Sequence, residues 1–380
     1  MFSGTVAARL LLLALGLASA AVLAVRERGV VRALPPVWLP FVLWAAWSML
    51  SLAWSIEPPH SARELKNEVG YAAAALWVCF VAAQARRAQP VLLAVFAAAS
   101  VVVCGIAIFE YSRGWDYYIT GAHGAAGNFS STLLVLTPCA LMAFWFAREA
   151  SWPKALRVAP LALGALFLAA AYTTESRTIW IALAAEAAVC LGLLALRARR
   201  PLSRRSLALG LLVAAGIAGA AAAMTARVQV MRESVGAHAM TDDPRLKLWP
   251  EVLESIEARP LLGYGFGRGV LRYTLRSEMK EAELWHAHNL FLDAALQTGL
   301  PGAALLAALF AALLWQGWRF AGDPGSPAAA ACGVALCGIV TGVLVRNMTD
   351  TLLVRQNALL FWATVGVLLA WGARAREPGG

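Results

Sequence analysis

Residues 90–109 read PVLLAVFAAASVVVCGIAIF, a run of apolar and small side chains that contains no charged residue. A helix rises about 1.5 Å per residue, so a helix of this length matches the ~30 Å hydrocarbon core of a bilayer. The rest of the chain has the same character, because 60% of its 380 residues are hydrophobic and only 14% are charged. The mean hydropathy of +0.66 excludes an ordinary soluble domain and predicts a membrane protein.

Eleven apolar runs are long enough to cross a membrane. They are residues 5–25, 37–54, 69–84, 90–109, 129–147, 155–173, 178–196, 206–224, 301–318, 327–345 and 353–372. All of them should be helices, because backbone groups without hydrogen-bond partners are costly in lipid. The predicted fold class is an all-α polytopic membrane protein with about 11–12 transmembrane helices and one large, partly helical external loop.

The net charge of +10 could indicate a nucleic-acid partner, but the distribution of the basic residues indicates topology instead. Arginines follow every second predicted span, and by the positive-inside rule these loops are cytoplasmic. The N-terminus then lies outside, and membrane lipids rather than nucleic acid are the expected partners. Residues 5–25 also resemble a cleavable signal peptide. Cleavage would make the 37–54 span enter from the wrong side, so we expect a retained helix.

Two external segments have appreciable length, residues 110–128 and residues 225–300. The predicted organisation is transmembrane helices in 1–224, an external loop or lid in 225–287, and a motif-bearing helix with the C-terminal spans in 288–380. Four alternating glycines from Gly263 to Gly269 follow no strand, so we expect a flexible turn that closes the loop onto the bundle rather than a nucleotide site. The six cysteines lie in apolar spans without a CxxC pair, which indicates neither disulfides nor zinc.

The stretch LWHAHNLFLDAALQTGLPG, residues 284–302, places two histidines where the large loop meets an apolar helix. On a helix, His286 and His288 would point to different sides, and the spacing of a HExxH zinc site is missing, so a metal is not expected. A histidine here could act as a general base toward a hydroxyl, or it could simply hydrogen-bond the loop. Asp293, one turn after Asn289, could orient a neighbour or a substrate.

Four arginines lie at predicted external helix ends: Arg177, Arg245, Arg346 and Arg355. Guanidinium groups that converge at a membrane surface suit a pyrophosphate, because the planar fork binds phosphate oxygens in pairs and keeps its charge. Alternatively, each arginine forms a structural ion pair or extends to lipid headgroups. The acids that could form such pairs are Glu175, Asp242 and Asp350.

The sequence resembles the O-antigen ligase and polymerase superfamily, whose ligase signature is His, then Asn, Ser or Gln, nine residues, Gly, two residues and Gly. His288, Asn289, Gly299 and Gly302 fit that spacing. Four further stretches resemble this superfamily within about residues 120–310: SRTIW at Arg177, DPRLKLW at Arg245, RPLLGYGFG from Arg259 and GNFSSTLLVLTP from Gly127. Such ligases are usually described with twelve spans and two cytoplasmic termini, so the eleven spans found here are a departure.

The resemblance implies a glycosyltransferase of the bacterial inner membrane that needs no metal and no cofactor. Its donor would be a glycan on undecaprenyl diphosphate, used at the periplasmic face. The hypothesis for the site is that Arg177 and Arg245 hold the donor diphosphate while His288 deprotonates the acceptor for inverting attack. His286, Asn289, Asp293, Arg346 and Arg355 are then expected to have supporting roles.

The acceptor is left open by the sequence. A ligase would use lipid A-core, a polymerase would use another lipid-linked repeat, and a related branch glycosylates protein hydroxyls. The His-Asn motif favours the ligase over the polymerase. A transporter of lipid-linked sugars is the alternative from another class, but it would need polar groups along a path through the bundle. The candidate residues collect on one external face instead.

Overall fold

The structure, a computed structural model, describes residues 14–19, 21–22, 36–85, 88–114, 126–149, 153–197, 244–279 and 284–376, together with five isolated residues between 216 and 226. Its α-helices are α3 Trp38–Leu50, α4 Pro58–Glu64, α5 Tyr71–Ala83, α6 Ala88–Ser112, α7 Ala126–Glu149, α8 Lys154–Thr173, α9 Arg177–Arg197, α11 Pro244–Ala258, α12 Arg272–Met279, α13 Leu290–Ala321, α14 Pro327–Asn347 and α15 Arg355–Arg374. A 3₁₀ turn, Ser51–Trp54, extends α3, and a π-helical turn, Leu65–Gly70, joins α4 to α5.

The predicted all-α polytopic membrane fold is confirmed for the described residues. Six helices (α6, α7, α9, α13, α14 and α15) are long and apolar enough to cross a membrane, and shorter apolar stretches lie at Trp38–Trp54 and Ala159–Thr173. The predicted spans 5–25 and 206–224 lie mostly outside the described residues. The span predicted at 301–318 lies in α13, which begins at Leu290 and leaves helical geometry at Thr298 and Gly299, so that span corresponds to the part of α13 after the break.

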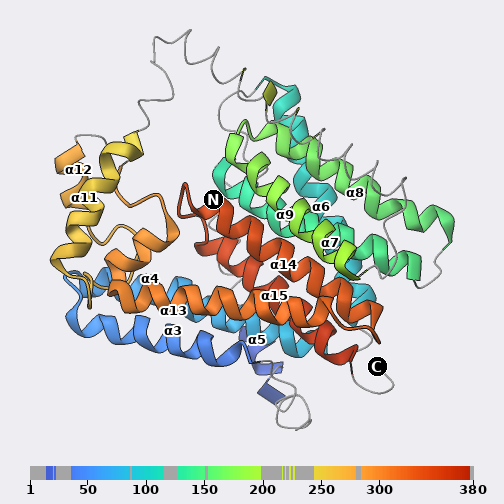
Figure 1. Ribbon diagram of the computed structural model, residues 1–380, viewed down its shortest axis with the longest axis horizontal. Helices are drawn as coiled ribbons and strands as arrows, with labels where there is room; N and C mark the ends of the chain where they lie inside the picture. Colours follow the sequence, from blue (N-terminus) through green and yellow to red (C-terminus); the bar gives the residue numbers. More distant parts are fainter. Residues whose placement is uncertain are drawn as a thin grey trace.

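Helix α14 is the centre of the bundle, where it packs against α7, α9, α13 and α15 (Figure 1). Small residues permit this central position. A Cβ atom added at Gly333 would lie 2.3 Å from the backbone nitrogen of Ala321 on α13. One added at Gly342 would lie 1.9 Å from a carboxyl oxygen of Glu186 on α9. Close helix packing at small residues favours helix association in lipid, where apolar burial alone contributes little.

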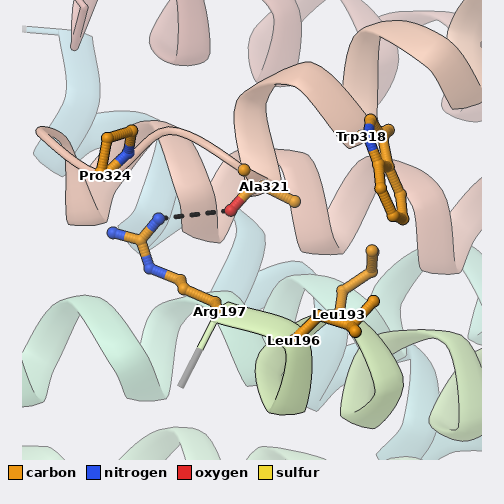
Figure 2. Close-up of a pocket in the computed structure, with 7 residues that line it drawn as sticks. Leu193, Leu196, Arg197, Trp318, Ala321 and Pro324 are labelled. Carbon is orange, nitrogen blue, oxygen red and sulfur yellow. Dashed lines mark hydrogen bonds between the residues drawn. The ribbon is translucent and has the colours of Figure 1, made fainter. Parts of the chain in front are cut away.

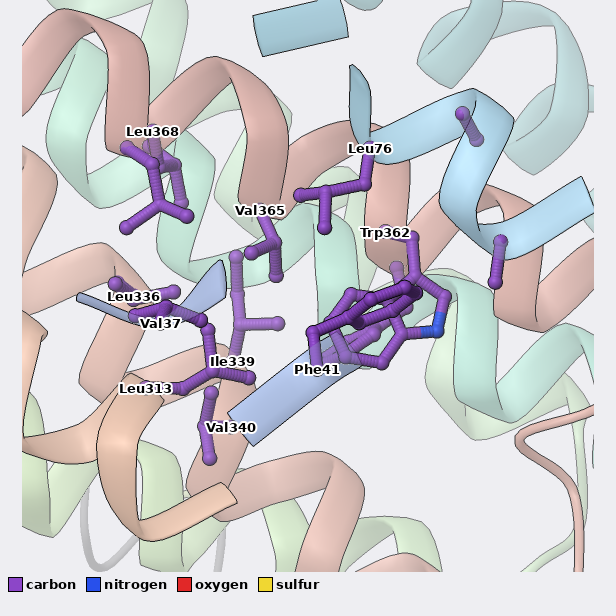
Figure 3. Packing of buried hydrophobic residues seen from close by; sticks show 14 of the residues in the cluster. Val37, Phe41, Leu76, Leu313, Leu336, Ile339, Val340, Trp362, Val365 and Leu368 are labelled. Atoms are coloured by element: carbon purple, nitrogen blue, oxygen red, sulfur yellow. The ribbon is translucent and has the colours of Figure 1, made fainter. Parts of the chain in front are cut away.

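The core between α3, α5, α13, α14 and α15 is filled by interlocking apolar side chains (Figure 3). Phe41 of α3 and Trp362 of α15 meet edge to face, with ring centroids 5.1 Å apart. Ile339 of α14 and Val365 of α15 are fully buried beside them. These contacts pack α15 against α14 and α3, and the turn that joins α14 to α15 holds one half of the candidate site.

Helix α13 is broken near its first third, where Thr298 and Gly299 leave helical geometry. The break frees two carbonyl groups, and the glycine-rich loop satisfies them: Tyr264 N–H donates to Leu296 at 2.9 Å and Gly265 N–H donates to Gln297 at 2.8 Å. Gly299 has a φ of +70°, and an added Cβ atom would lie 2.3 Å from the carbonyl oxygen of Leu261. The expected closing turn is therefore a docked one that inserts into a gap in α13.

The described part of the external loop forms a small unit beside the first third of α13 (Figure 1). One face of α11, with Leu248, Val252 and Ile256, is buried against Ala295 and Leu296 of α13. The indole of Trp249 donates to the carbonyl of Ala287 at 3.0 Å. These contacts hold the beginning of α11 over the segment that carries the two histidines.

Candidate active site

The two histidines lie in an irregular segment between α12 and α13, not on a helix. Their rings stack, with centroids 3.8 Å apart and planes 28° from parallel. The expectation that they point to different sides was therefore wrong. The cause is the backbone of His288, which has a φ of +49°, in the left-handed region. Non-glycine residues in that region are strained, and such strain clusters at functional sites.

His288 is paired with Asp350, which lies in the turn between α14 and α15. The His288 Nδ1 atom is 3.2 Å from an Asp350 carboxyl oxygen, and the two side chains are 16% and 21% exposed. Burial alone would raise the pKa of Asp350, but the hydrogen bond with His288 and the charge of Arg346 outweigh burial and hold the pKa below its usual range. Asp350 is thus a carboxylate that can only accept, so His288 Nδ1 donates and Nε2 keeps the lone pair.

His286 is more deeply buried than His288 and is 3% exposed. Its Nδ1 accepts from the backbone N–H of His288 at 3.0 Å, and the same atom lies 3.4 Å from Asp293. One nitrogen cannot accept from an N–H and also donate to a carboxylate, so we assign it to the shorter, directional backbone bond. The proton of neutral His286 then sits on Nε2, 3.9 Å from Asp350. Burial lowers the pKa of His286, although Asp293 opposes this.

Asp293 and Asn289 build the frame around the histidines. Asp293 accepts from the backbone N–H of Ala287 at 2.9 Å and from the hydroxyl of Thr351. Asn289 caps α13, because its side-chain oxygen accepts from the N–H groups of the second and third residues of the helix. Its amide nitrogen also donates to the carbonyl of Met348 at 3.0 Å. Both residues therefore tie the start of α13 to the turn that carries Asp350.

Arg346 is the buried cation of the site and is 6% exposed. Its Nε donates to the Ser130 hydroxyl at 3.2 Å, on the first turns of α7. The negative charge of Asp350 favours the charged guanidinium of Arg346, and the positive charge of Arg245 opposes it. Arg245, the second residue of α11, is thus brought near Arg346. The structure gathers these two arginines within electrostatic range, beside the carboxylate that pairs with His288.

The other two predicted arginines are placed differently. Arg177 is the first residue of α9, and no described contact joins it to the histidines or to Arg346. Arg355 is the exposed first residue of α15, with a φ of +50°. Its charge acts on Glu68 of the π-helical turn. Of the four arginines, the structure therefore connects Arg245 and Arg346 to each other.

Sequence reasoning gave no functional role to Asp350, Thr351 or Arg268. Arg268 donates to the carbonyl of Thr351 at 2.7 Å, and its guanidinium lies 4.9 Å from the ring centre of Trp285. It therefore clamps the docked loop to the Asp350 turn and to the residue before His286. The available signal was RNMTDTLLVR, a polar stretch between two apolar spans, but its partners are far away in sequence.

His286, His288 and Asp350 could also hold a divalent cation, because one ligand atom from each lies within 4.8 Å of the others. Two imidazoles and a carboxylate are a common set of zinc ligands. The same geometry is that of a hydrogen-bonded histidine and aspartate pair, with no ion needed. The absence of a metal therefore remains a prediction.

The described cavities differ in how they relate to these residues. A narrow one of about 50 Å³ lies directly behind the site and is bounded by Asp293, Gln297, Thr351, Arg268 and Glu68. The largest, of about 590 Å³, is formed by the far ends of α9 and α13, where Arg197 donates to the carbonyl of Ala321 (Figure 2). Neither histidine nor Asp350 lines this cavity, so its size is no evidence about the chemistry of the candidate site.

Comparison with known families gives a match over part of the chain. The family described as O-antigen ligase matches residues 162–307 of the chain. That stretch contains Arg177, Arg245, both histidines and the two motif glycines, whereas Arg346 and Asp350 lie beyond it. The match supports the O-antigen ligase and polymerase superfamily as the one that this chain resembles, and with it a glycosyltransferase-like enzyme acting on lipid-linked glycans. No curated protein matches the chain significantly.

Proposed function

We propose that this protein transfers a glycan from undecaprenyl diphosphate to a hydroxyl of lipid A-core, with inversion at the anomeric carbon and without a metal. The observation that carries the proposal is the pairing of His288 with Asp350 at 3.2 Å beside the two arginines Arg245 and Arg346. Such a site unites a general base with a cationic surface for a diphosphate leaving group, which are the two things this reaction needs.

The base acts on the acceptor. As the acceptor oxygen forms its bond to the anomeric carbon, its proton moves to Nε2 of His288, the nitrogen that does not face Asp350. Asp350 stabilises the imidazolium that results and holds the ring in one tautomer. Asp293 and Asn289 act as positioning residues, because they fix the segment that carries His288 against the Asp350 turn.

The arginines act on the donor. When the bond between the anomeric carbon and the diphosphate breaks, its electron pair stays on the diphosphate oxygen, and the developing charge needs fixed cations. Arg245 and Arg346 supply them in this arrangement, and Arg177, the first residue of α9, is the third candidate. Guanidinium groups suit this task better than ammonium groups, since each can contact two phosphate oxygens.

The topology proposed for this chemistry is a bacterial inner membrane protein with its site toward the periplasm. The positive-inside distribution of the loops supports that orientation. The ends that meet at the site are the starts of α7, α13 and α15 and the end of α14, and all of these are external in the predicted topology. A glycan exported on its lipid carrier would reach the site from that side.

The decisive experiment gives purified protein a labelled undecaprenyl-diphosphate glycan with and without lipid A-core, in the presence and absence of a chelator. Label that moves to the core only when core is present supports the ligase. Longer glycans on the carrier, formed from donor alone, would identify a polymerase instead. Activity that is lost with chelator and restored by a divalent cation would contradict the metal-free chemistry.

The matched variants for this assay are His288→Ala and His286→Ala, which remove neighbouring imidazoles. We expect His288→Ala to abolish transfer and His286→Ala to reduce it less, because only His288 is assigned as the base. Full activity in His288→Ala would refute that assignment. Sugar flux through proteoliposomes without any glycan transfer would favour a transporter.

A further inference from the structure

A long apolar groove of about 410 Å³ runs between α5, α6, α7 and α15. Its walls are almost entirely hydrocarbon. The lining residues include Phe96 and Ala99 of α6, Leu136 of α7, and Leu360 and Ala363 of α15. Among the described residues the groove is open along one side, because α6 makes few contacts with α5 and packs mainly on α8. In a membrane protein such a groove faces the acyl region.

The upper end of the groove adjoins the candidate site. Thr132 of α7 and Leu360 of α15 line that end, and one turn above them Asn357 donates to Asn128 at 3.2 Å. Directly before Asn128 is Gly127, where an added Cβ atom would lie 3.6 Å from the guanidinium of Arg346. From Thr132 to Gly127 the helix rises by about 7.5 Å. Arg346 therefore lies close above the mouth of the groove.

Arg346 places a positive charge at that mouth, and no described residue forms a direct ion pair with it. It is 6% exposed, and its one side-chain hydrogen bond among the described residues goes to a neutral hydroxyl. Asp350 acts on it from a distance but is itself engaged by His288, and Arg245 adds a second positive charge nearby. A buried guanidinium without an ion pair among the described residues is costly, so the arrangement calls for an anion. The N-terminal end of α7 adds to this attraction.

We propose that the groove holds the prenyl chain of the donor, with the donor diphosphate against Arg346 at its upper end. This inference rests on the proposed function, because it assigns a place to the lipid of that donor. The occupant must be an amphiphile whose anionic head and apolar tail are joined directly, as they are in a prenyl diphosphate. The cavity accommodates only the part of the chain nearest the head, and the rest continues into the bilayer.

The lining residues also offer a way to narrow the groove. Ala99 and Ala363 are small lining residues, whereas Phe96 and Leu136 are larger ones. Among the lining side chains, Ser100, Thr132 and Thr364 are the ones that carry a hydroxyl group. A larger side chain at Ala99 or Ala363 should therefore hinder the chain without touching the diphosphate or the base.

The test compares two donors that carry the same glycan diphosphate, one on undecaprenol and one on a short, water-soluble prenyl alcohol. The variants are Ala363→Trp, Ala99→Phe and, as a control, Val102→Trp, which alters a lipid-facing position of α6 that is 58% exposed and outside the groove. We expect the ratio of kcat/KM for the long donor to that for the short donor to fall at least about tenfold in the two groove variants. That change corresponds to about 1.4 kcal/mol, the burial of about two methylene groups.

A second measurement covers the case in which Ala363→Trp does not fold. Wild-type protein is photo-crosslinked to undecaprenyl diphosphate that carries a diazirine on its third isoprene unit, and the labelled peptides are identified by mass spectrometry. Label on α6, α7 and α15 within the groove is expected. Label confined to other helices, or an unchanged ratio in both groove variants, would overturn the proposal. Absence of transfer from either donor in the wild type would instead refute the proposed function.

Discussion

Asp350→Asn is the substitution that tests the site most directly. Asparagine keeps the shape of the side chain but removes the negative charge that lies 3.2 Å from His288 Nδ1. Its amide group can also donate toward the ring, which would favour the tautomer with its lone pair on Nδ1. Both effects act on the base, and neither removes a cation from the donor site.

The size of the effect follows from that distance. Two unit charges 3.2 Å apart interact with about 1.3 kcal/mol at the dielectric constant of water and about 5 kcal/mol at an effective value near 20. Because the two side chains are partly exposed, the lower half of this range applies. Each 1.36 kcal/mol is tenfold in rate, so kcat should fall by about tenfold to about 200-fold. This overlaps the 10²- to 10⁴-fold range that is typical of general-base catalysis.

The assay is steady-state transfer of labelled glycan at several donor concentrations. Removing Asp350 leaves Arg346 less neutralised, so the KM for the donor should stay the same or fall while kcat drops. Asp323→Asn is the matched control, since Asp323 also forms an ion pair, with Arg376 at 2.6 Å, at the other end of the bundle. A kcat above half the wild-type value, or a loss that arises entirely from a higher KM, would refute the pairing as a catalytic one.

Three further predictions concern stability and the frame of the site, each measured by thermal unfolding in detergent. The pKa of His286 is lowered in the folded protein, so below about pH 6.5 the unfolded chain binds more protons than the folded one. The stabilising contribution of neutral His286 is therefore fully present above that pH and is lost as the pH falls. His286→Gln removes this one titrating group, so the variant should lose less stability between pH 7.5 and 5 than the wild type. Gly299→Ala should lower the free energy of unfolding by more than about 2 kcal/mol, because alanine disfavours the positive φ and its Cβ atom would clash with Leu261. Gly105→Ala, in open space on α6, should leave stability unchanged or raise it. Equal melting temperatures for the two variants would contradict the docked loop. Asn289→Asp should keep the cap of α13 and lose only the hydrogen bond to the Met348 carbonyl. Asn289→Ala should lose the cap as well and be less stable than the aspartate variant by about 1 kcal/mol. A larger loss of stability in the aspartate variant would contradict the capping role.

The membrane helices could be predicted from the sequence because length and apolar character are local properties. The nine predicted spans inside the described residues all contain a helix. The span predicted at 301–318 begins just after the break in α13 at Thr298 and Gly299. Asp293, Gln297 and Gly299 interrupt the apolar pattern before Pro301, so hydropathy alone does not show that the first part of α13 is continuous with this span. The helix forms there because Asn289 caps it and because the docked loop satisfies the carbonyls at its break.

The candidate site could be predicted only in part. Histidine and arginine at external helix ends are visible in the sequence, and so is the Asn289 motif. The pairing of His288 with Asp350 is not, because it joins residues 62 positions apart and depends on a backbone conformation that histidine seldom adopts. The placement of Arg346 rather than Arg177 beside the histidines likewise depends on burial, and a sequence does not show how deeply a residue at a helix end is buried.

Backbone strain gives an independent reason to place function at this end of the bundle. The described residues contain three non-glycine positions with positive φ: Glu175, His288 and Arg355. Each lies at or just before the first residue of a helix, namely α9, α13 and α15. A left-handed residue costs about 1–2 kcal/mol, and it persists only where the surrounding contacts determine it. The strain at His288 has a visible result, because it turns one imidazole onto the other and brings Nδ1 to Asp350. Since α9, α13 and α15 begin at the same predicted face, the strained positions, the arginines and the mouth of the groove fall at one surface, where a lipid-borne anion would arrive.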